Sequence, residues 1–98
     1  MKYDLECQYD TRKSFYGKAI VEETKNNNVE DYKLYSYDTL VARITIIGNI
    51  VTYHYFGKYS QTTTRHQKEF YKQYGNLSDK ELKELFKNGI LEVKNGNN

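Results

Sequence analysis

The clearest pattern in the chain is a pair of alternating segments that meet at Gly48-Asn49. Apolar and polar residues alternate from Leu40 to Ile47 and again from Ile50 to Phe56, which is the period of half-buried strands. A two-residue connection that contains glycine and asparagine is typical of a tight antiparallel hairpin. The predicted register pairs Ile46 with Val51, Ile44 with Tyr53 and Ala42 with Tyr55, and it leaves Arg43, Thr45, Thr52 and His54 on the polar face.

Two further strands are predicted upstream of this hairpin. Ser14 to Glu23 alternates with period two, and Gly17 within it is interpreted as a bulge or a close approach. The polar segment Thr24 to Asp31 then turns the chain, and Tyr32 to Ser36 returns as the second strand. The alternation in Met1 to Lys13 is weak, and it fits either an edge strand or an irregular lead-in.

A first helix is predicted over about residues 62–74. His66, Phe70 and Tyr74 recur every four residues, which puts a ring-rich face on one side of a helix. Lys68, Lys72 and Gln73 fall on the other side. The hydroxyls of Ser60, Thr62 and Thr63 are alternative N-caps, and the pattern does not choose among them.

A second helix is predicted over about residues 79–87. Ser78-Asp79-Lys80-Glu81 forms a capping box, and Leu77 with Leu82 forms the matching hydrophobic staple. Gly89 is expected to close the helix in the left-handed conformation, with Ile90 folding back on Leu85. Residues 94–98 are expected to be a frayed tail.

These elements predict a single α+β domain that spans residues 1–98. Its antiparallel sheet has four strands, or five with the N-terminal segment. The 62–74 helix lies on one face, and the 79–87 helix closes it. Only 38% of the residues are hydrophobic, but 11 tyrosines add apolar ring surface to the core.

Charge and cysteine content narrow the class of protein. Fifteen Lys and Arg against 13 Asp and Glu give a net charge of +2, which is far from the basic balance of a dedicated nucleic-acid-binding domain. A lone Cys7 cannot form an intramolecular disulfide, no apolar run is long enough to cross a bilayer, and the segment MKYDLECQYD is not a signal peptide. We therefore expect a cytoplasmic protein with no membrane partner.

The polar residues of the first helix offer no sufficient catalytic or metal pattern. Arg65, His66 and Glu69 lie within one and a half turns, so an acid-base pair or a two-ligand metal site is an alternative to a purely structural role. A zinc site needs three or four ligands, which His54 and Cys7 do not supply. No serine or cysteine is framed as a nucleophile with an oriented base. We expect no enzymatic activity, no metal and no cofactor.

Two groups of residues are predicted around the first helix. Thr62, Thr63 and Arg65 at the helix N-terminus could bind a phosphate or carboxylate, and the favoured alternative is a capped helix with a surface arginine. Separately, an external role for Arg65 as a partner contact competes with an internal one, in which Arg65 and His66 bond sheet carbonyls or pair with a carboxylate such as Asp38. The internal role is favoured. The predicted binding residues are Arg65, Lys68, Lys72, Tyr55, Tyr59 and Tyr71, and the predicted structural motif is Thr62, Thr63, His66, Glu69 and Phe70.

Three sequence blocks carry a family resemblance. The first block is Thr11 to Ala19, the second is Tyr35 to Thr39, and the third comprises Tyr59-Ser60, Thr62-Thr63, Arg65-His66 and Glu69-Phe70. Together they resemble a family of small uncharacterised proteins encoded by phages and other mobile elements of low-GC bacteria, over roughly Thr11 to Gly75.

This resemblance implies an accessory protein that binds a host or defence protein, and it indicates a context more than a mechanism. A CRISPR effector or its nucleic-acid complex is one such target, which would make the protein an anti-CRISPR inhibitor. Tyrosine and arginine, which dominate protein-protein hot spots, agree with this function. The alternative is an RNA- or DNA-binding module that uses tyrosines and the basic helix face. The oligomeric state is not predicted.

Overall fold

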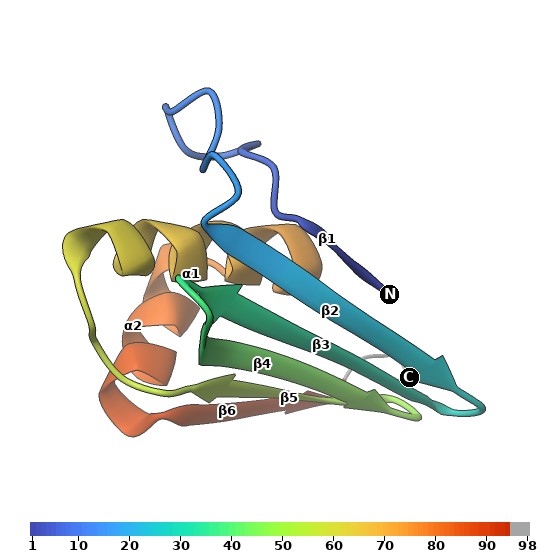
Figure 1. Ribbon diagram of the computed structural model, residues 1–98. Helices are drawn as coiled ribbons and strands as arrows, with labels where there is room; N and C mark the ends of the chain where they lie inside the picture. The colour runs from blue at the N-terminus through green and yellow to red at the C-terminus, as the bar shows by residue number, and fades with distance from the viewer. Residues whose placement is uncertain (95–98) are drawn as a thin grey trace.

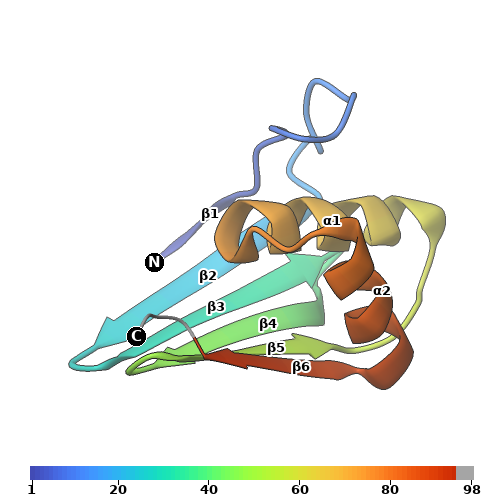
Figure 2. The same ribbon diagram turned by 180° about the vertical axis from the view of Figure 1, so that it is seen from behind.

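The computed structural model describes residues 1–94, which form one antiparallel sheet with two helices packed on one of its faces (Figures 1 and 2). The six strands lie in the order β1-β2-β3-β4-β5-β6, and the predicted α+β class is confirmed with more strands than expected. The elements are β1 (Lys2–Asp4), β2 (Ala19–Asn26), β3 (Val29–Ser36), β4 (Thr39–Ile47), β5 (Ile50–Tyr55), α1 (Gln61–Gly75), α2 (Asp79–Asn88) and β6 (Ile90–Lys94).

Three two-residue turns connect β2 to β5. They are Asn27-Asn28, Tyr37-Asp38 and Gly48-Asn49, each between the last paired residues of adjoining strands. Asn27, Tyr37, Asp38 and Gly48 all have positive φ, between 51° and 69°. Such backbones match the right-handed twist of the flanking strands. The predicted β4–β5 register is confirmed at all three apolar pairs, and Arg43 faces His54 as expected.

Three predicted strand boundaries are wrong, one of which is the end of the first strand, at Asn26 and not at Glu23. The strand expected from Ser14 begins only at Ala19, because Tyr16 and Gly17 have φ values of 53° and 76° and reverse the chain in a turn. Gly17 is therefore a turn residue and not a strand bulge. The second strand begins at Val29, three residues before Tyr32, because the connection is only two residues long. The N-terminal segment pairs with β2 as a short edge strand and then runs into a loop, residues 5–18.

Strand β6 was not predicted. Ile90–Lys94 pairs antiparallel with β5, and Leu91 and Val93 face the helices. Lys94 pairs with Ile50, so the expected fraying at Lys94 is wrong, and residues 95–98 lie outside the described part of the chain. Ile90 pairs with His54 on the opposite face of the sheet, so it does not fold back on Leu85.

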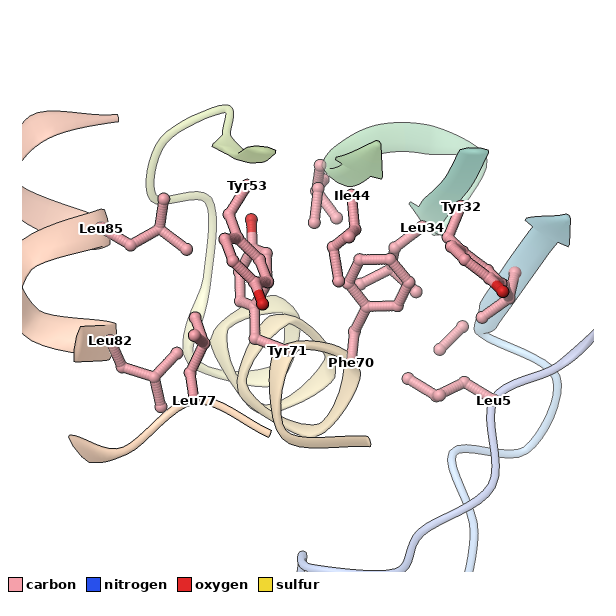
Figure 3. Packing of buried hydrophobic residues seen from close by; sticks show 14 of the residues in the cluster. Leu5, Tyr32, Leu34, Ile44, Tyr53, Phe70, Tyr71, Leu77, Leu82 and Leu85 are labelled. Carbon is pink, nitrogen blue, oxygen red and sulfur yellow. The ribbon is translucent and has the colours of Figure 1, made fainter. Parts of the chain in front are cut away.

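Helix α1 provides most of the core contact. Ser60 is its N-cap, and its hydroxyl accepts the Thr63 N–H at 3.1 Å, which decides among the three alternatives. Phe70 and Tyr71 have no exposed surface and point toward sheet residues that include Leu34 and Ile44 (Figure 3). The helix ends at Gly75, where a Cβ atom would meet Tyr53 Cε1 at 2.4 Å, so only glycine permits this close approach.

Gln67 ties α1 to the sheet and to the preceding loop. Its side chain is fully buried, and Nε2 donates to the carbonyl oxygens of Val41 at 3.0 Å and Gly57 at 3.1 Å. Val41 lies at a register shift between β3 and β4, and its carbonyl accepts the Phe56 N–H at 3.3 Å as well as the Gln67 side chain. This polar contact fixes the N-terminal half of α1 over the end of the sheet.

Helix α2 closes the other part of the same face. Both bonds of the predicted capping box are present, between Ser78 and Glu81 at 2.9 and 3.2 Å. Gly89 ends the helix at φ 81°, as expected for a left-handed cap. Neither α1 nor α2 has the length and apolar character needed to cross a bilayer, and residues 1–94 contain no other α-helix.

We expect Ser78→Ala to lower the free energy of unfolding by about 1 kcal/mol, because the Glu81 amide loses its side-chain acceptor. Urea unfolding of Ser78→Ala beside Lys80→Ala, an exposed position of the same turn, measures the effect. Identical midpoints for Ser78→Ala and wild type would contradict a stabilising cap.

Candidate binding site at the N-terminal half of helix α1

The Glu69 carboxylate organises the 5–18 loop. Glu69 is 2% exposed, and its two oxygens accept backbone N–H bonds from Gln8, Tyr9 and Asp10 at 2.8–3.1 Å. Gln73 Nε2 donates to the same carboxylate at 2.6 Å. Hydrogen bonds to an ionised acceptor are about twice as strong as neutral ones. A single side chain of α1 therefore holds three consecutive amides of a long loop.

Arg65 adds a second, outer contact between α1 and this loop. Its Nη1 lies 3.0 Å from Asp10 Oδ1, and the same oxygen accepts the Arg12 N–H at 2.9 Å. The carboxylate partner is thus Asp10, and the Asp38 pairing named as an example from the sequence is wrong. The Arg65 side chain is 43% exposed, whereas that of Asp10 is only 10% exposed.

We expect Arg65→Ala to lower the free energy of unfolding by about 1 kcal/mol, because the exposed Arg65 side chain contributes little even though its partner Asp10 is largely buried. The matched control is Lys68→Ala, one turn along the same helix and also exposed. Thermal unfolding measures the difference. An equally stable Arg65→Ala protein that no longer captured a partner would instead identify Arg65 as a binding residue.

His66 lies at the centre of a buried polar and aromatic group. Its Nδ1 is 2.8 Å from Ser36 Oγ, which in turn lies 2.9 Å from Thr63 Oγ1. The imidazole packs edge-on against Phe15 and is stacked with Tyr37, at ring-centre distances of 4.5 and 5.9 Å. His66 Nε2 has no hydrogen-bond partner among residues 1–94. The pKa of His66 is lowered to about 4, mainly by burial; the Asp10 charge opposes this shift, and the nearby Arg12 charge adds to it.

Acid should therefore destabilise the fold through His66. Its pKa is lowered from 6.5 to about 4 on folding, so between these values the unfolded chain binds the proton more readily. The stabilising contribution is fully present above pH 6.5 and falls as the pH drops to about 4, by up to about 3 kcal/mol. Urea unfolding at several pH values from 5 to 6.5 should give a smaller slope for His66→Asn than for wild type. Equal slopes would contradict a neutral buried imidazole.

A cavity of about 190 Å³ opens beside His66, and we call it the His66 cavity. Every residue that lines it belongs to one of the three sequence blocks. The 5–18 loop supplies the first block, the β3–β4 turn the second and the first turns of α1 the third. The lining residues are Arg12, Ser14, Phe15, Tyr16, Lys18, Tyr37, Thr62 and His66. The fold thus gathers the three blocks, which are far apart in the chain, around one opening.

The chain matches one family over most of its length. The DUF8033 family, described as a family of unknown function, matches residues 3–88. The chain belongs to this family. The match extends beyond the Thr11 to Gly75 resemblance at both ends and includes α2. No curated protein and no solved structure matches the chain.

The geometry around His66 does not form a serine-histidine catalytic pair. Ser36 is 2% exposed and is not among the residues that line the cavity, so its hydroxyl is closed to a substrate. Glu69 is occupied by loop amides and does not contact His66. Within residues 1–94, no group of three His, Cys, Asp or Glu side chains is placed to hold a metal ion.

The predicted binding residues do not form a single site. Tyr71 is wrong as a binding residue, because it is fully buried and donates its hydroxyl to the His54 carbonyl. Tyr55 is half-buried and stacked on Phe86 of α2 at 4.4 Å. Lys72 lies 3.6 Å from Asp79. Arg65, Lys68 and Lys72 share a hollow on the outer side of α1 with Tyr9 and Asp10.

Exposed aromatic rings gather around the start of α1. Among residues 1–94, every exposed aromatic residue lies in the 5–18 loop, the β3–β4 turn or the β5–α1 connection. These segments lie toward the same end of the sheet, where β2 begins and β3 and β5 end (Figure 1). Of the five rings, only Tyr59 was predicted to bind, because turns give no periodic signal that separates an exposed ring from a core ring. The rings are Tyr9, Tyr16, Tyr37, Phe56 and Tyr59.

Proposed function

We propose that this chain is a phage or mobile-element accessory protein that binds a host or defence protein in the bacterial cytoplasm. The observation that carries the proposal is the set of exposed aromatic rings at the α1 end, defined above. Tyrosine and other aromatic residues are enriched at the centres of protein interfaces, where they contribute much of the binding energy. These five rings are 44–73% exposed, and exposed apolar surface at one end of a domain is typical of protein interaction sites.

The segments that present these rings are held in place before any partner arrives. Glu69 holds the amides of residues 8–10, and Gln67 holds Gly57 in the β5–α1 connection. A surface ordered in advance loses less conformational entropy on association. Side chains of α1 therefore hold the segments that form the binding surface, and the exposed rings on those segments contact the partner.

Nucleic acid is the weaker alternative. Its best support is the basic hollow on α1, but there Arg65 is paired with Asp10, and Lys72 lies 3.6 Å from Asp79. Much of the positive charge is thus already neutralised within the chain. A phosphate-binding surface should instead present several unpaired cations.

The first test is capture of the partner by cross-linking in the host, followed by binding measurements with the purified partner. The triple variant Tyr9→Ala, Tyr16→Ala, Tyr59→Ala should lose binding at an unchanged melting temperature. A matched control is Val29→Ser with Ile47→Ser, which removes exposed apolar side chains at the opposite end of the sheet. Equal loss in both variants would contradict an aromatic site.

Salt dependence separates the two classes of partner. Affinity for a protein centred on aromatic rings should fall only modestly between 50 and 200 mM salt. A nucleic acid held by 6–10 phosphate contacts would lose about 10³–10⁵ in affinity over that interval. A loss of that size would replace the proposed protein partner with a nucleic acid.

An inhibitor of CRISPR immunity is the specific form of this function that we propose to test in cells. Expression of the chain in a CRISPR-active host should restore transformation by a targeted plasmid. The triple tyrosine variant should not restore it, and the Val29→Ser, Ile47→Ser control should. Unchanged interference with every variant would reject this target and leave other host proteins as partners.

A further inference from the structure

The His66 cavity is lined by hydrogen-bond donors and positive charge. Within the fold, Lys18 Nζ also lies 5.9 Å from the centre of the Tyr37 ring, and Ser14 Oγ accepts the Tyr16 N–H at 2.8 Å. Arg12 and Lys18 bring two cations to its lining, and Ser14 and Thr62 bring hydroxyls. Thr62 lies in the first turn of α1, where backbone amides lack intrahelical acceptors and the helix dipole is positive. These groups share a preference for an anion.

The buried imidazole gives an independent indication of a ligand. His66 is fully buried, and its Nδ1 is engaged by Ser36. His66 lines the cavity, and its buried Nε2 has no hydrogen-bond partner among residues 1–94. A buried polar atom without a partner is uncommon and calls for an explanation.

The hydroxyl chain suggests which proton Nε2 carries. If Thr63 Oγ1 donates to Ser36 Oγ, then the Ser36 hydroxyl donates to His66 Nδ1. The neutral imidazole then carries its proton on Nε2, and this N–H has no acceptor within residues 1–94. A donor without an acceptor beside two cations favours a negatively charged ligand.

We propose that the His66 cavity binds the phosphate group of a small ligand. Arg12 and Lys18 neutralise its charge, and His66 Nε2–H and the Thr62 hydroxyl donate to its oxygens. Arginine suits this role because its planar guanidinium donates two parallel bonds to phosphate. This site goes beyond the proposed partner protein and does not depend on it.

The size and rim of the cavity bear on where the phosphate group comes from. A cavity of about 190 Å³ accommodates a phosphate with a small attached group. Tyr16 and Tyr37 line the cavity and remain more than half exposed, so each ring has surface left for a planar group carried by the ligand. Free phosphate, a sugar phosphate and a nucleoside monophosphate share the anchoring chemistry, and the experiment distinguishes them.

Two carboxylates lie near this site. Asp10 is already bonded to Arg65 and to the Arg12 amide. Asp38 lies in the β3–β4 turn and lines a neighbouring hollow with Lys18 and Tyr37. Its charge opposes an anion, and asparagine tolerates its left-handed backbone at φ 69°. Asp38→Asn should therefore bind phosphate at least as tightly as wild type.

The experiment titrates ¹⁵N-labelled full chain with inorganic phosphate, ribose 5-phosphate, AMP and adenosine at constant ionic strength. The His66 ring nitrogens should report the Nε2–H form in the free protein, and each phosphate-bearing probe should shift them. Adenosine should leave them unchanged. Tighter binding of AMP than of inorganic phosphate would assign the ligand to nucleotides, and equal binding would assign it to the phosphate group alone.

Arg12→Ala and Lys18→Ala should each weaken phosphate binding about tenfold, the effect of one lost hydrogen bond to a charged group. Lys83→Ala, an exposed lysine of α2, is the matched charge control and should change nothing. The proposal is overturned by any of four results: absence of a phosphate-induced shift, a free imidazole protonated on Nδ1, weaker binding in Asp38→Asn, or equal affinity in all three lysine and arginine variants.

Discussion

Phe70→Ala should lower the free energy of unfolding by about 3–5 kcal/mol, because it removes a ring from the centre of the core. Phe70 has no exposed surface and lies among Leu34, Ile44 and Tyr74 on the helix-covered face of the sheet (Figure 3). A loss of this size is a large part of the 5–15 kcal/mol that is typical for a folded domain. We therefore expect Phe70→Ala to be largely unfolded near 37 °C.

The matched control is Lys72→Ala, two residues along the same helix. Lys72 is only partly buried, and its one ion pair, to Asp79, spans 3.6 Å. Its loss should cost less than about 1 kcal/mol. Circular dichroism melts of the two variants give the comparison directly, and equal melting temperatures would contradict the observed orientation of α1.

The second large effect is expected for Glu69→Gln, on the order of 3 kcal/mol. The substitution keeps the shape of the side chain, but it replaces one acceptor oxygen with an NH₂ group. That group would face amides of residues 8–10, which are themselves donors. Removing a charged acceptor from buried donors costs about 1–3 kcal/mol for each unsatisfied group. Because the loop can partly relax, we expect a total loss smaller than the sum of the costs for the three amides.

Hydrogen exchange locates this loss. The Gln8, Tyr9 and Asp10 amides should exchange much faster in Glu69→Gln, while amides of β4 and β5 keep the protection set by global stability. Glu84→Gln, at an exposed position of α2, makes the same charge change and should leave both exchange and melting unaltered. Protected loop amides in Glu69→Gln would mean that Glu69 does not hold the loop.

The polar residues of the third block could not be assigned roles from their residue types alone. The sequence places hydroxyls, an arginine, a histidine and a carboxylate in one helix start, and that collection suits a cap, an anion site or a catalytic group. In the folded chain, Ser60 caps, Glu69 receives the loop amides, and Arg65 pairs with Asp10. Among the buried side-chain atoms of residues 1–94, His66 Nε2 and Gln67 Oε1 have no hydrogen-bond partner.

The sequence by itself determined the elements whose signals are local. The Gly48-Asn49 turn and the alternation on both sides of it decide the β4–β5 register, because a slip of one residue would expose the whole apolar face. The Ser78 to Glu81 box and Gly89 decide both ends of α2, since each satisfies amides or carbonyls within one turn. The class of fold follows from these elements in chain order.

The tertiary structure decided what depends on residues far apart in the chain. Strand β6 is only five residues long, and it is stable because β5 supplies its hydrogen bonds. Tyr71 is buried because it packs between α1, α2 and the sheet. Tyr16 is exposed because it lies in a turn, at positive φ, although the residue type is the same. Glu69 and the 5–18 loop are about 60 residues apart, and no periodic pattern encodes their contact. The His66 cavity arises in the same way, because three separate blocks become neighbours only when the sheet and α1 have packed.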